Sequence, residues 1–332
     1  MLLSVVVPAY NAEKFLAKNL PSLVEERLRG RVEILVVNDG SRDRTGEIAD
    51  DFERRYPGYF RVIHQENGGH GGVINRGIAE ARGMFFKVVD ADDWVITENL
   101  VRLADGLEKT DADAVINPYY KVDERSGKQV LCDEFAPAGV PLRLEDLSAK
   151  GFRFVMHAVT YRTALLRDHG IRLTERCYYD DFQYDLYPAP WLKTLVYWDF
   201  PVYMYLVGQK NQSVSAASSL KNMPMYLKVL EDSVAYVRSV EGEADPGARR
   251  YMEDSLCAFT RSVYNIYLRN PDTAETRRAM METDRVIADI APDVYQEVGA
   301  RNRYIRVLRK NNAAAFALLS GLLRLRKAVE IS

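Results

Sequence analysis

Three aspartates, Asp90, Asp92 and Asp93, stand within four positions of the chain, directly after an apolar run typical of a buried strand. Carboxylates this close repel one another, and a strand end that gathers them usually holds a hard cation through oxygen ligands. We therefore expect a site for Mg²⁺ or Mn²⁺. The alternative is a solvated acidic turn in which Asp93 or Thr97 caps the next helix.

Glycines surround His70 some twenty positions earlier, at Gly68, Gly69, Gly71 and Gly72. They predict a loop whose backbone approaches a ligand closely. The loop is no P-loop, because the Lys and the Ser or Thr that end that motif are missing. It also lacks the Gly-x-Gly-x-x-Gly pattern of a nicotinamide dehydrogenase. An EF-hand is excluded as well, because the acidic segment lacks the glycine and the closing glutamate that this calcium loop requires.

The elements that must position these residues alternate between β-rich and helical patterns over about the first 120 residues, as in βαβ units around a mostly parallel sheet. In open sheets of this kind ligands bind outside the carboxyl ends of the strands, so the chemistry is expected at that edge. The expected strands are 2–7, 32–37, 60–64 and 84–89, and the expected helices are 13–28, 43–55 and a stretch from the glycines to 82.

Beyond residue 120 the patterns change twice. Residues 121–150 predict an irregular or hairpin insertion with Ser126-Gly127 as its turn, and aromatic, β-rich pieces return from 151 to about 215. After 219 the pattern is mostly helical and ends in a basic stretch. The fold class expected for the whole chain is therefore α/β, with helices on both faces of the sheet and a helical C-terminal region.

Composition narrows the class of protein further. The 332 residues are 47% hydrophobic and 28% charged, and the formal net charge of −2 gives no electrostatic case for nucleic acid as a partner. Three widely spaced cysteines, Cys132, Cys177 and Cys257, suit free thiols in a reducing cytosol. The N-terminus lacks the basic start of a secretion signal, and no segment reaches the ~20 apolar residues of a membrane span. We therefore expect a cytoplasmic protein.

In order and spacing, the chain resembles the family-2 glycosyltransferases with the GT-A fold in three nucleotide-binding segments: SVVVPAYNAEKFL, VVNDGSRDRTGEIA and NGGHGGVINRGIAEARGMFFKVVDADDW. The resemblance is dense to about residue 110 and continues in YYDDF and YMYLVGQKNQSVS. It implies a GT-A type, Rossmann-like sheet and an inverting transferase that moves one sugar from a nucleotide-diphosphate donor. The product expected is a cell-surface polysaccharide, made on a glycan or lipid-linked acceptor.

The resemblance also implies a domain division. Residues 1–216 would form the catalytic domain, with a nucleotide-sugar half at 1–110 and an acceptor half at 111–216. Residues 217–332 would form the helical C-terminal region with its basic tail.

The donor site implied by the resemblance begins at the ends of the first two strands. Asp39 would accept a hydrogen bond from the ring N–H of uracil, and Ser41 would lie beside it; uracil and thymine offer such an imide N–H and adenine does not. A UDP-sugar is the donor that the resemblance favours. The residues expected to line the base and ribose are Pro8, Ala9, Tyr10, Asn11 and Glu13.

The remaining donor residues come from the glycine and aspartate segments. By the same resemblance Gly69, His70 and Asn75 would pass under the donor, and Asp90 and Ala91 would lie near its ribose or sugar. Asp92 would hold the metal that bridges the two phosphates.

Two positions depart from the family pattern. The arginine that commonly precedes Asn75 is Ile74 here, so Arg76 or His70 would have to take its role. The later basic loop retains Lys210 as its fixed cation. Three further residues, Asp93, Trp94 and His157, are possible parts of the donor or acceptor site, although a lone histidine such as His157 is more often structural.

Direct displacement at a sugar carbon requires a general base for the acceptor hydroxyl. The string Tyr178-Tyr179-Asp180-Asp181 supplies two candidates. We expect Asp180 to be the base and Asp181 to cap the following helix, although either could cap it.

Three other classes of protein have features in common with this sequence. A dehalogenase-type phosphotransferase also uses a DxD motif, but after its first strand. A nucleotide-sugar binding protein without transferase activity would keep the same carboxylates. A processive synthase would need membrane helices and a Gln-x-x-Arg-Trp motif, which this chain lacks.

The basic C-terminal stretch has two interpretations. It could contact the inner, anionic surface of the membrane peripherally, or it could be an amphipathic helix packed on the protein. Its basic residues are Arg301, Arg303, Arg306, Arg309, Lys310, Arg324, Arg326 and Lys327.

Overall fold

The computed structural model describes residues 1–133, 138–149, 151–208, 216–311 and 315–321. The chain divides into two compact units. Unit 1 comprises Met1–Gln209 with Ala244–Ala248, and unit 2 comprises Lys210–Glu243 with Arg249–Ser332. The predicted division into a catalytic domain at 1–216 and a helical region at 217–332 stays a prediction.

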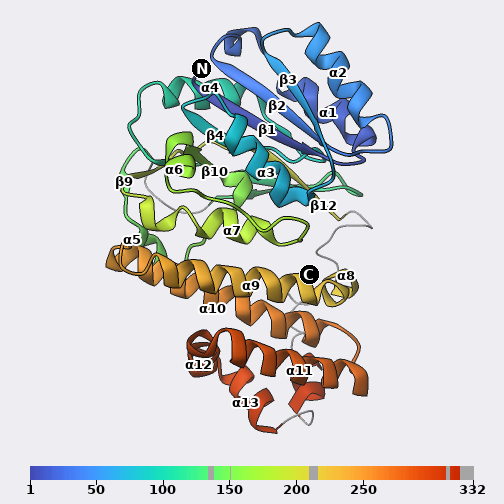
Figure 1. The fold of residues 1–332 in the computed structure, drawn as a ribbon, viewed down its shortest axis with the longest axis vertical. Helices are drawn as coiled ribbons and strands as arrows, with labels where there is room; N and C mark the ends of the chain where they lie inside the picture. The colour runs from blue at the N-terminus through green and yellow to red at the C-terminus, as the bar shows by residue number, and fades with distance from the viewer. Residues whose placement is uncertain (134–137, 150, 209–215, 312–314, 322–332) are drawn as a thin grey trace. The chain divides into compact units, whose positions relative to one another are not determined.

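Unit 1 begins with four parallel strands, β1 (Leu3–Ala9), β2 (Val32–Asp39), β3 (Phe60–Gln65) and β4 (Phe85–Val88), in the order β3-β2-β1-β4. The chain therefore moves outward from β1 to β3 and then returns to the other side of β1. Right-handed crossovers place α1 (Glu13–Ser22) and α2 (Thr45–Arg55) on one face and α3 (Gly69–Glu80) on the other (Figure 1). The expected α/β class with helices on both faces is confirmed.

These strands form because their apolar runs are covered on both faces. Every residue of β1 and β2 is buried, as expected of central parallel strands. Helix α3 approaches β1 closely at Gly77, where an added Cβ would lie 2.8 Å from Val6 Cγ1. The glycine therefore sets how near the helix can lie to the sheet.

The sheet continues beyond β4 with mixed polarity. In the described residues it has eight strands, in the order β3-β2-β1-β4-β10-β6-β11-β9. Strand β10 is antiparallel to β4 and β6, and β11 is parallel to β6. The bounds are β6 (Ala114–Ile116), β9 (Pro141–Leu142), β10 (Val159–Arg162) and β11 (Leu195–Tyr197).

A second sheet of four described strands, in the order β5-β12-β7-β8, lies beyond the acidic segment in the chain. Its strands are β5 (Trp94–Val95), β7 (Tyr119–Asp123), β8 (Gln129–Cys132) and β12 (Tyr203–Val207). The predicted hairpin is confirmed in β7 and β8, where Gly127 has φ +66° and Asp123 accepts hydrogen bonds from Ser126. Strand β5 pairs with β12, which brings β12 next to the acidic segment.

The shorter helices of unit 1 connect these strands. They are η1 (Glu26–Leu28), α4 (Thr97–Leu107), α5 (Leu144–Ala149), η2 (Met156–Ala158), α6 (Thr163–Asp168), α7 (Asp180–Leu186) and η3 (Ala189–Trp191).

Two sequence predictions about local structure were wrong. The helix expected at 13–28 ends at Ser22, one residue after Pro21, and a separate 3-10 turn follows. Because proline has no backbone N–H to donate within a helix, it weakens the helix around it, and α1 ends directly after Pro21. The glycine segment was expected to be a loop, but Gly69, Gly71 and Gly72 form the first turn of α3.

Unit 2 is helical, as predicted. Its helices are α8 (Ala216–Lys221), α9 (Met223–Ser239), α10 (Pro246–Arg269, of which the part after Ala248 belongs to this unit), α11 (Ala274–Ile290), α12 (Pro292–Arg301) and α13 (Arg303–Asn311). Asp284 joins three of them: it accepts hydrogen bonds from Tyr264, Tyr295 and Arg309. A half-buried carboxylate with several hydrogen-bond partners of this kind fixes helix positions.

The amphipathic helix α13 turns its apolar side inward. Ile305 and Leu308 are buried, and Arg309 is engaged with Asp284. The basic residues 324, 326 and 327 lie outside the described residues, and contact with a membrane surface stays a prediction. Within the described residues, no helix combines the length and the apolar character that crossing a membrane requires.

Candidate active site

The imidazole of His70 joins two carboxylates that come from different parts of the chain. Its Nδ1 lies 2.7 Å from Asp180 Oδ2, and its Nε2 lies 3.0 Å from Asp90 Oδ1. His70 is in the first turn of α3, Asp90 follows β4, and Asp180 begins α7. The ends of three elements therefore meet at one ring.

The two neighbouring carboxylates favour the protonated, positively charged form of the His70 ring. Burial alone would lower its pKa, but the charge and hydrogen bond of Asp180, together with the hydrogen bond of Asp90, raise the pKa well above 6.5. Both ring nitrogens then donate, one to each carboxylate. Asp180 is only 3% exposed, so this pairing compensates a carboxylate that would otherwise be costly to bury.

Asp181 differs sharply from its neighbour. It is exposed to solvent, but the surrounding protein partly desolvates its carboxyl group, and this desolvation with the charge of Asp180 raises the pKa to about 6. The charge of His70 acts in the opposite direction. A reachable carboxyl group with a pKa near neutrality suits proton transfer at physiological pH.

Neither aspartate occupies the capping position of α7. The N-cap is Tyr179, which has φ +72°, and Asp180 is the first helical residue. The expectation that Asp181 or Asp180 serves as the cap was therefore wrong. The left-handed conformation of Tyr179 turns the chain into the helix so that one carboxylate faces His70 and the next faces solvent.

Asp39 fixes the start of α3. Its Oδ1 accepts hydrogen bonds from Gln65 Nε2 and Gly68 N, each at 2.8 Å, and its Oδ2 accepts one from Gly69 N at 2.9 Å. A carboxylate at a helix N-terminus is favoured by the unpaired N–H groups and the helix dipole. Because a carboxylate offers about four acceptor positions, the predicted bond from uracil stays possible beside these three.

The glycines let the start of α3 lie against the segment that precedes α7. An added Cβ on Gly69 would lie 2.8 Å from Arg176 Cα, and one on Gly71 would lie 2.4 Å from the carbonyl oxygen of Thr174. Gly69 also has φ +74°, which favours glycine. These glycines therefore serve close packing between two segments of protein, a use that the sequence pattern alone did not distinguish from ligand approach.

Asn75 ties the same two segments together. Its Nδ2 donates to Leu173 O at 2.9 Å, and its Oδ1 accepts from Leu173 N at 2.8 Å. The amide thus completes a two-bond clamp on the backbone. Its predicted contact with the donor is untested.

The three clustered aspartates have different surroundings. Asp93 is buried, accepts hydrogen bonds from Tyr203 Oη at 2.6 Å and Leu206 N at 2.7 Å, and has its pKa raised by burial and by the charges of Asp90 and Asp92. It therefore holds β12 to the acidic segment. Tyr203 also accepts a hydrogen bond from Asp90 N, a role that no pattern in the sequence indicated.

Asp92, like Asp90, is half-buried and lies at the strand-end edge. Ala91, between Asp90 and Asp92, is buried. No group of three or more His, Cys, Asp or Glu side chains in the described parts of the chain is arranged to hold a metal ion. Mg²⁺ commonly takes only one or two protein carboxylates and completes its shell with water and substrate phosphates, so a single aspartate fits such a site.

The end of β1 forms the other wall of this edge. Asn11 has φ +48°, and its backbone N–H donates to Ser41 Oγ at 3.0 Å while its side chain accepts from Arg42 N at 2.9 Å. Tyr10 is 51% exposed, whereas Pro8 and Ala9 are buried. Sheet order reverses between β1 and β4, and ligands of open α/β sheets bind at such a switch point.

Glu13 supports this wall from the start of α1. Its Oε2 accepts a hydrogen bond from Arg44 N at 3.0 Å, and Asp43 Oδ2 accepts one from Glu13 N at 3.2 Å. Its predicted place beside the donor is untested.

Two of the possible site residues, Trp94 and His157, make contacts that involve aromatic rings. Lys18 Nζ lies 3.0 Å from the ring centre of Trp94, so one face of that ring is covered. The ring of His157 lies among those of Tyr119, Tyr203 and Tyr205, with centroid distances of 4.2, 5.2 and 4.8 Å. Burial lowers the pKa of His157 to about 3, which keeps it neutral.

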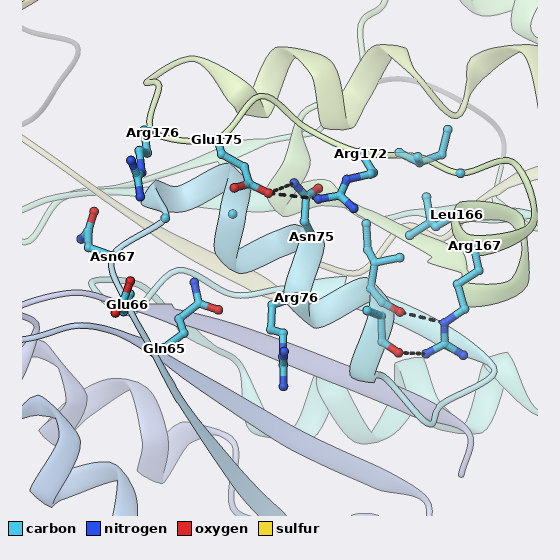
Figure 2. Close-up of a pocket in the computed structure, with 16 residues that line it drawn as sticks. Gln65, Glu66, Asn67, Asn75, Arg76, Leu166, Arg167, Arg172, Glu175 and Arg176 are labelled. Atoms are coloured by element: carbon cyan, nitrogen blue, oxygen red, sulfur yellow. Dashed lines mark hydrogen bonds and ion pairs between the residues drawn. The ribbon is translucent and has the colours of Figure 1, made fainter.

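The structure distinguishes Arg76 from His70, the two candidates to replace the family arginine that is Ile74 here. Ile74 is buried, and Arg76 pairs with Glu80 at 2.9 Å. Arg76 lines a pocket of about 630 Å³ together with Gly72, Asn75 and Ala79 (Figure 2). By helix geometry these positions lie on the face of α3 opposite His70. Only His70 of the two therefore reaches Asp90. Lys210 lies outside the described residues.

Comparison with known proteins matches these residues to one family. The family model for glycosyl transferase family 2 matches residues 4–180. The uncharacterized glycosyltransferase EpsJ of Bacillus subtilis is 42% identical over 185 residues, which cover 52% of this chain and 53% of EpsJ. Glycosyltransferase GlyG of Streptococcus pneumoniae is 41% identical over 128 residues, covering 38% of this chain and 42% of GlyG. The chain thus matches about half, or less, of the length of these relatives.

The fold has solved counterparts. The crystal structure of Staphylococcus aureus TarS 1–349 in complex with UDP-GlcNAc is similar with a TM-score of 0.72 and 21% identity, over 98% of this chain and 92% of that one. The mannosyltransferase PcManGT from Pyrobaculum calidifontis, in complex with GDP-Man and Mn²⁺, has a TM-score of 0.52 and 15% identity, over 97% of this chain and 86% of that one. These likenesses show the GT-A fold.

Proposed function

The chain belongs to glycosyl transferase family 2, and from this premise we propose that it transfers a single sugar from a UDP-sugar to a glycan or glycolipid acceptor, with inversion at the anomeric carbon. The observation that carries the proposal is the arrangement of Asp90, His70 and Asp180 with exposed Asp181 beside them, at the sheet edge where ligands of this fold class bind. We further propose a role in cell-surface polysaccharide synthesis.

A uridine nucleotide is favoured by two observations. Asp39 keeps acceptor capacity beside its three protein hydrogen bonds, which suits the imide N–H of uracil. TarS, whose fold is similar over nearly the whole chain, was crystallised with UDP-GlcNAc. Exposed Tyr10 at the end of β1 would offer a flat apolar surface to the base.

We assign the general base to Asp181 instead of Asp180. In this mechanism Asp181 takes the proton from the acceptor hydroxyl, and the oxygen of that hydroxyl attacks the anomeric carbon. The bond from that carbon to the donor phosphate breaks, and its electron pair leaves with the nucleoside diphosphate. Asp181 can do this because it is exposed with a pKa of about 6, whereas Asp180 is buried and paired with His70.

Asp92 would hold Mg²⁺ or Mn²⁺ together with the donor phosphates. The bound metal would neutralise charge that develops on the leaving diphosphate. Asp92 suits this task because its half-buried carboxylate follows β4 at the strand-end edge, and hard cations prefer oxygen ligands of this kind.

We also propose that the enzyme acts in the cytoplasm. Among the described cysteines, Cys132 and Cys257 are free thiols, which suits a reducing compartment. Peripheral contact with the inner membrane surface stays a prediction.

The decisive experiment is a screen of UDP-, GDP- and dTDP-sugars with Mn²⁺, read by thermal stabilisation and by donor hydrolysis. A donor at 100 times its Kd should add about 2.7 kcal/mol of stability. We expect stabilisation and turnover with a UDP-sugar, and loss of turnover in Asp181→Asn. Binding without any turnover, with or without glycan acceptors, would instead identify a nucleotide-sugar binding protein.

A further inference from the structure

We propose that His70 is a positioning residue: its imidazolium holds Asp180 against Asp90 and thereby fixes the start of α7, so that Asp181 faces the acceptor. This inference rests on the proposed function, because it assigns a task to Asp181. It assigns to His70 no contact with substrate. The bridge itself is observed through Nδ1 and Nε2, at 2.7 and 3.0 Å from the two carboxylates.

No other described side chain could take the place of His70 between Asp90 and Asp180. Among the described residues, His70 is the one cation within ion-pairing distance of Asp90 or Asp180. Removing it would leave Asp180 as a buried carboxylate beside the carboxyl groups of Asp181 and Asp90. A buried charge without a partner either takes up a proton or moves toward solvent, and in both cases the start of α7 changes.

The support of His70 is rigid on both sides. Asp39 accepts from the N–H groups of Gly68 and Gly69, the two residues that precede the imidazole in the chain. On the other side, Arg176 N donates to Gly68 O at 2.7 Å, and Gly71 packs against Thr174. The ring is therefore held by the same segment, 174–176, that leads into α7, so its position and that of α7 are set together.

The charge of His70 also bears on the neighbouring base. Burial and the charges of Asp180 and Asp90 raise the pKa of Asp181, and the charge of His70 lowers it. Loss of His70 should therefore raise the pKa of Asp181. A residue with a purely structural role would lower stability without moving the pH dependence of catalysis.

The test compares His70→Gln with His64→Gln in the full chain. His64 is a suitable control because it also contacts an aspartate, Asp50 at 2.9 Å, and an asparagine, Asn38 at 2.9 Å, but it lies on β3 away from α7. We expect His70→Gln to lower kcat about 100-fold, as small misplacements of reacting groups do, and to move the acid limb of the pH profile upward. Donor KM should change by less than about threefold, and His64→Gln should match wild type. Equal kcat and equal pH profiles for the two variants would overturn the proposal.

A second measurement does not depend on turnover. The chain has four histidines, so single variants assign the imidazole ¹⁵N signals of each. We expect His70 to keep both N–H protons at pH 8 in the wild type and to lose one of them in Asp180→Asn. A wild-type His70 that titrates near 6.5 would overturn the bridge, even if His70→Gln fails to fold. If the bridge is found but no nucleotide-sugar is turned over, the proposed function fails and the bridge stands.

Discussion

Asp180 and His70 form an ion pair of 2.7 Å across 110 positions of the chain. The pair withdraws Asp180 from solvent and leaves the adjacent Asp181 as the reachable carboxyl group of α7. Two neighbouring residues of identical type thus have different chemistry, because one points to a cation and the other to solvent.

Replacing each aspartate separately by asparagine tests whether Asp181 is the base and Asp180 the partner of His70. Asp181→Asn is expected to lower kcat by about 10² to 10⁴, the usual contribution of a general base, with donor affinity nearly unchanged. Asp180→Asn should lose less rate but unfold more easily, since it leaves His70 with only Asp90. Steady-state kinetics with acceptor and donor titrations measure both effects. An inactive Asp180→Asn beside an active Asp181→Asn would return the base to Asp180.

The pH dependence of kcat/KM is expected to show an acid limb. Asp181 must be ionised to accept a proton, and its pKa is raised to about 6, so activity should fall as the pH drops through about 6. The charge of Asp180 contributes to this shift, and Asp180→Asn should therefore move the limb to lower pH. An acid limb at the same pH in Asp180→Asn would show that the charge of Asp180 does not set the pKa of the catalytic group.

Replacing the proposed base, Asp181, by asparagine should raise the free energy of unfolding at neutral pH. The pKa of Asp181 is raised from 3.8 to about 6, so the folded state binds its proton more tightly than the unfolded state does. Stability then decreases as the pH rises from 3.8 to about 6, and the loss persists above that range. Asp181→Asn should exceed wild type in urea unfolding at pH 7.5, and the difference should vanish near pH 3.8. The exposed α11 residue Asp289, changed to Asn, serves as the surface control.

Two adjacent glycines should respond oppositely to alanine. A Cβ on Gly71 would lie 2.4 Å from the Thr174 carbonyl oxygen, so Gly71→Ala must displace the segment before α7 and should cost about 1–3 kcal/mol together with activity. On Gly72 the nearest atom would be 3.6 Å away, in the side chain of Glu175, so Gly72→Ala should be neutral or stabilising by up to about 1 kcal/mol. Thermal unfolding and turnover measure both, and a tolerated Gly71→Ala would contradict the packing argument.

Asp92→Asn is expected to abolish donor binding that depends on metal, and to leave the fold intact because Asp92 lies at the half-buried edge. Calorimetric titration of UDP-sugar with and without Mn²⁺ measures the effect. Asp93→Asn is the contrasting variant: it should lose stability through Tyr203 and β12. Full turnover by the wild type in excess chelator would refute the metal site.

The sequence by itself determined the parallel half of the sheet. Continuous apolar runs such as Leu3–Ala9 can be covered only between two layers of helices, and the polar turn after each run marks the carboxyl edge. For the same local reason the acidic segment after β4 and the Asp39 turn were found without a structure. Pro21 and the glycines ahead of α3 misled the prediction, because propensity does not show whether a glycine gives flexibility or close packing.

Only the tertiary structure decided what the site residues do. His70 meets Asp90 and Asp180 across separations of 20 and 110 residues, and no periodic pattern of the sequence encodes such contacts. The choice between Asp180 and Asp181 depends on burial, which belongs to the packed fold and not to either residue. Because desolvation and neighbouring charges set a pKa, the chemistry of two identical side chains became distinct only when the chain folded around them.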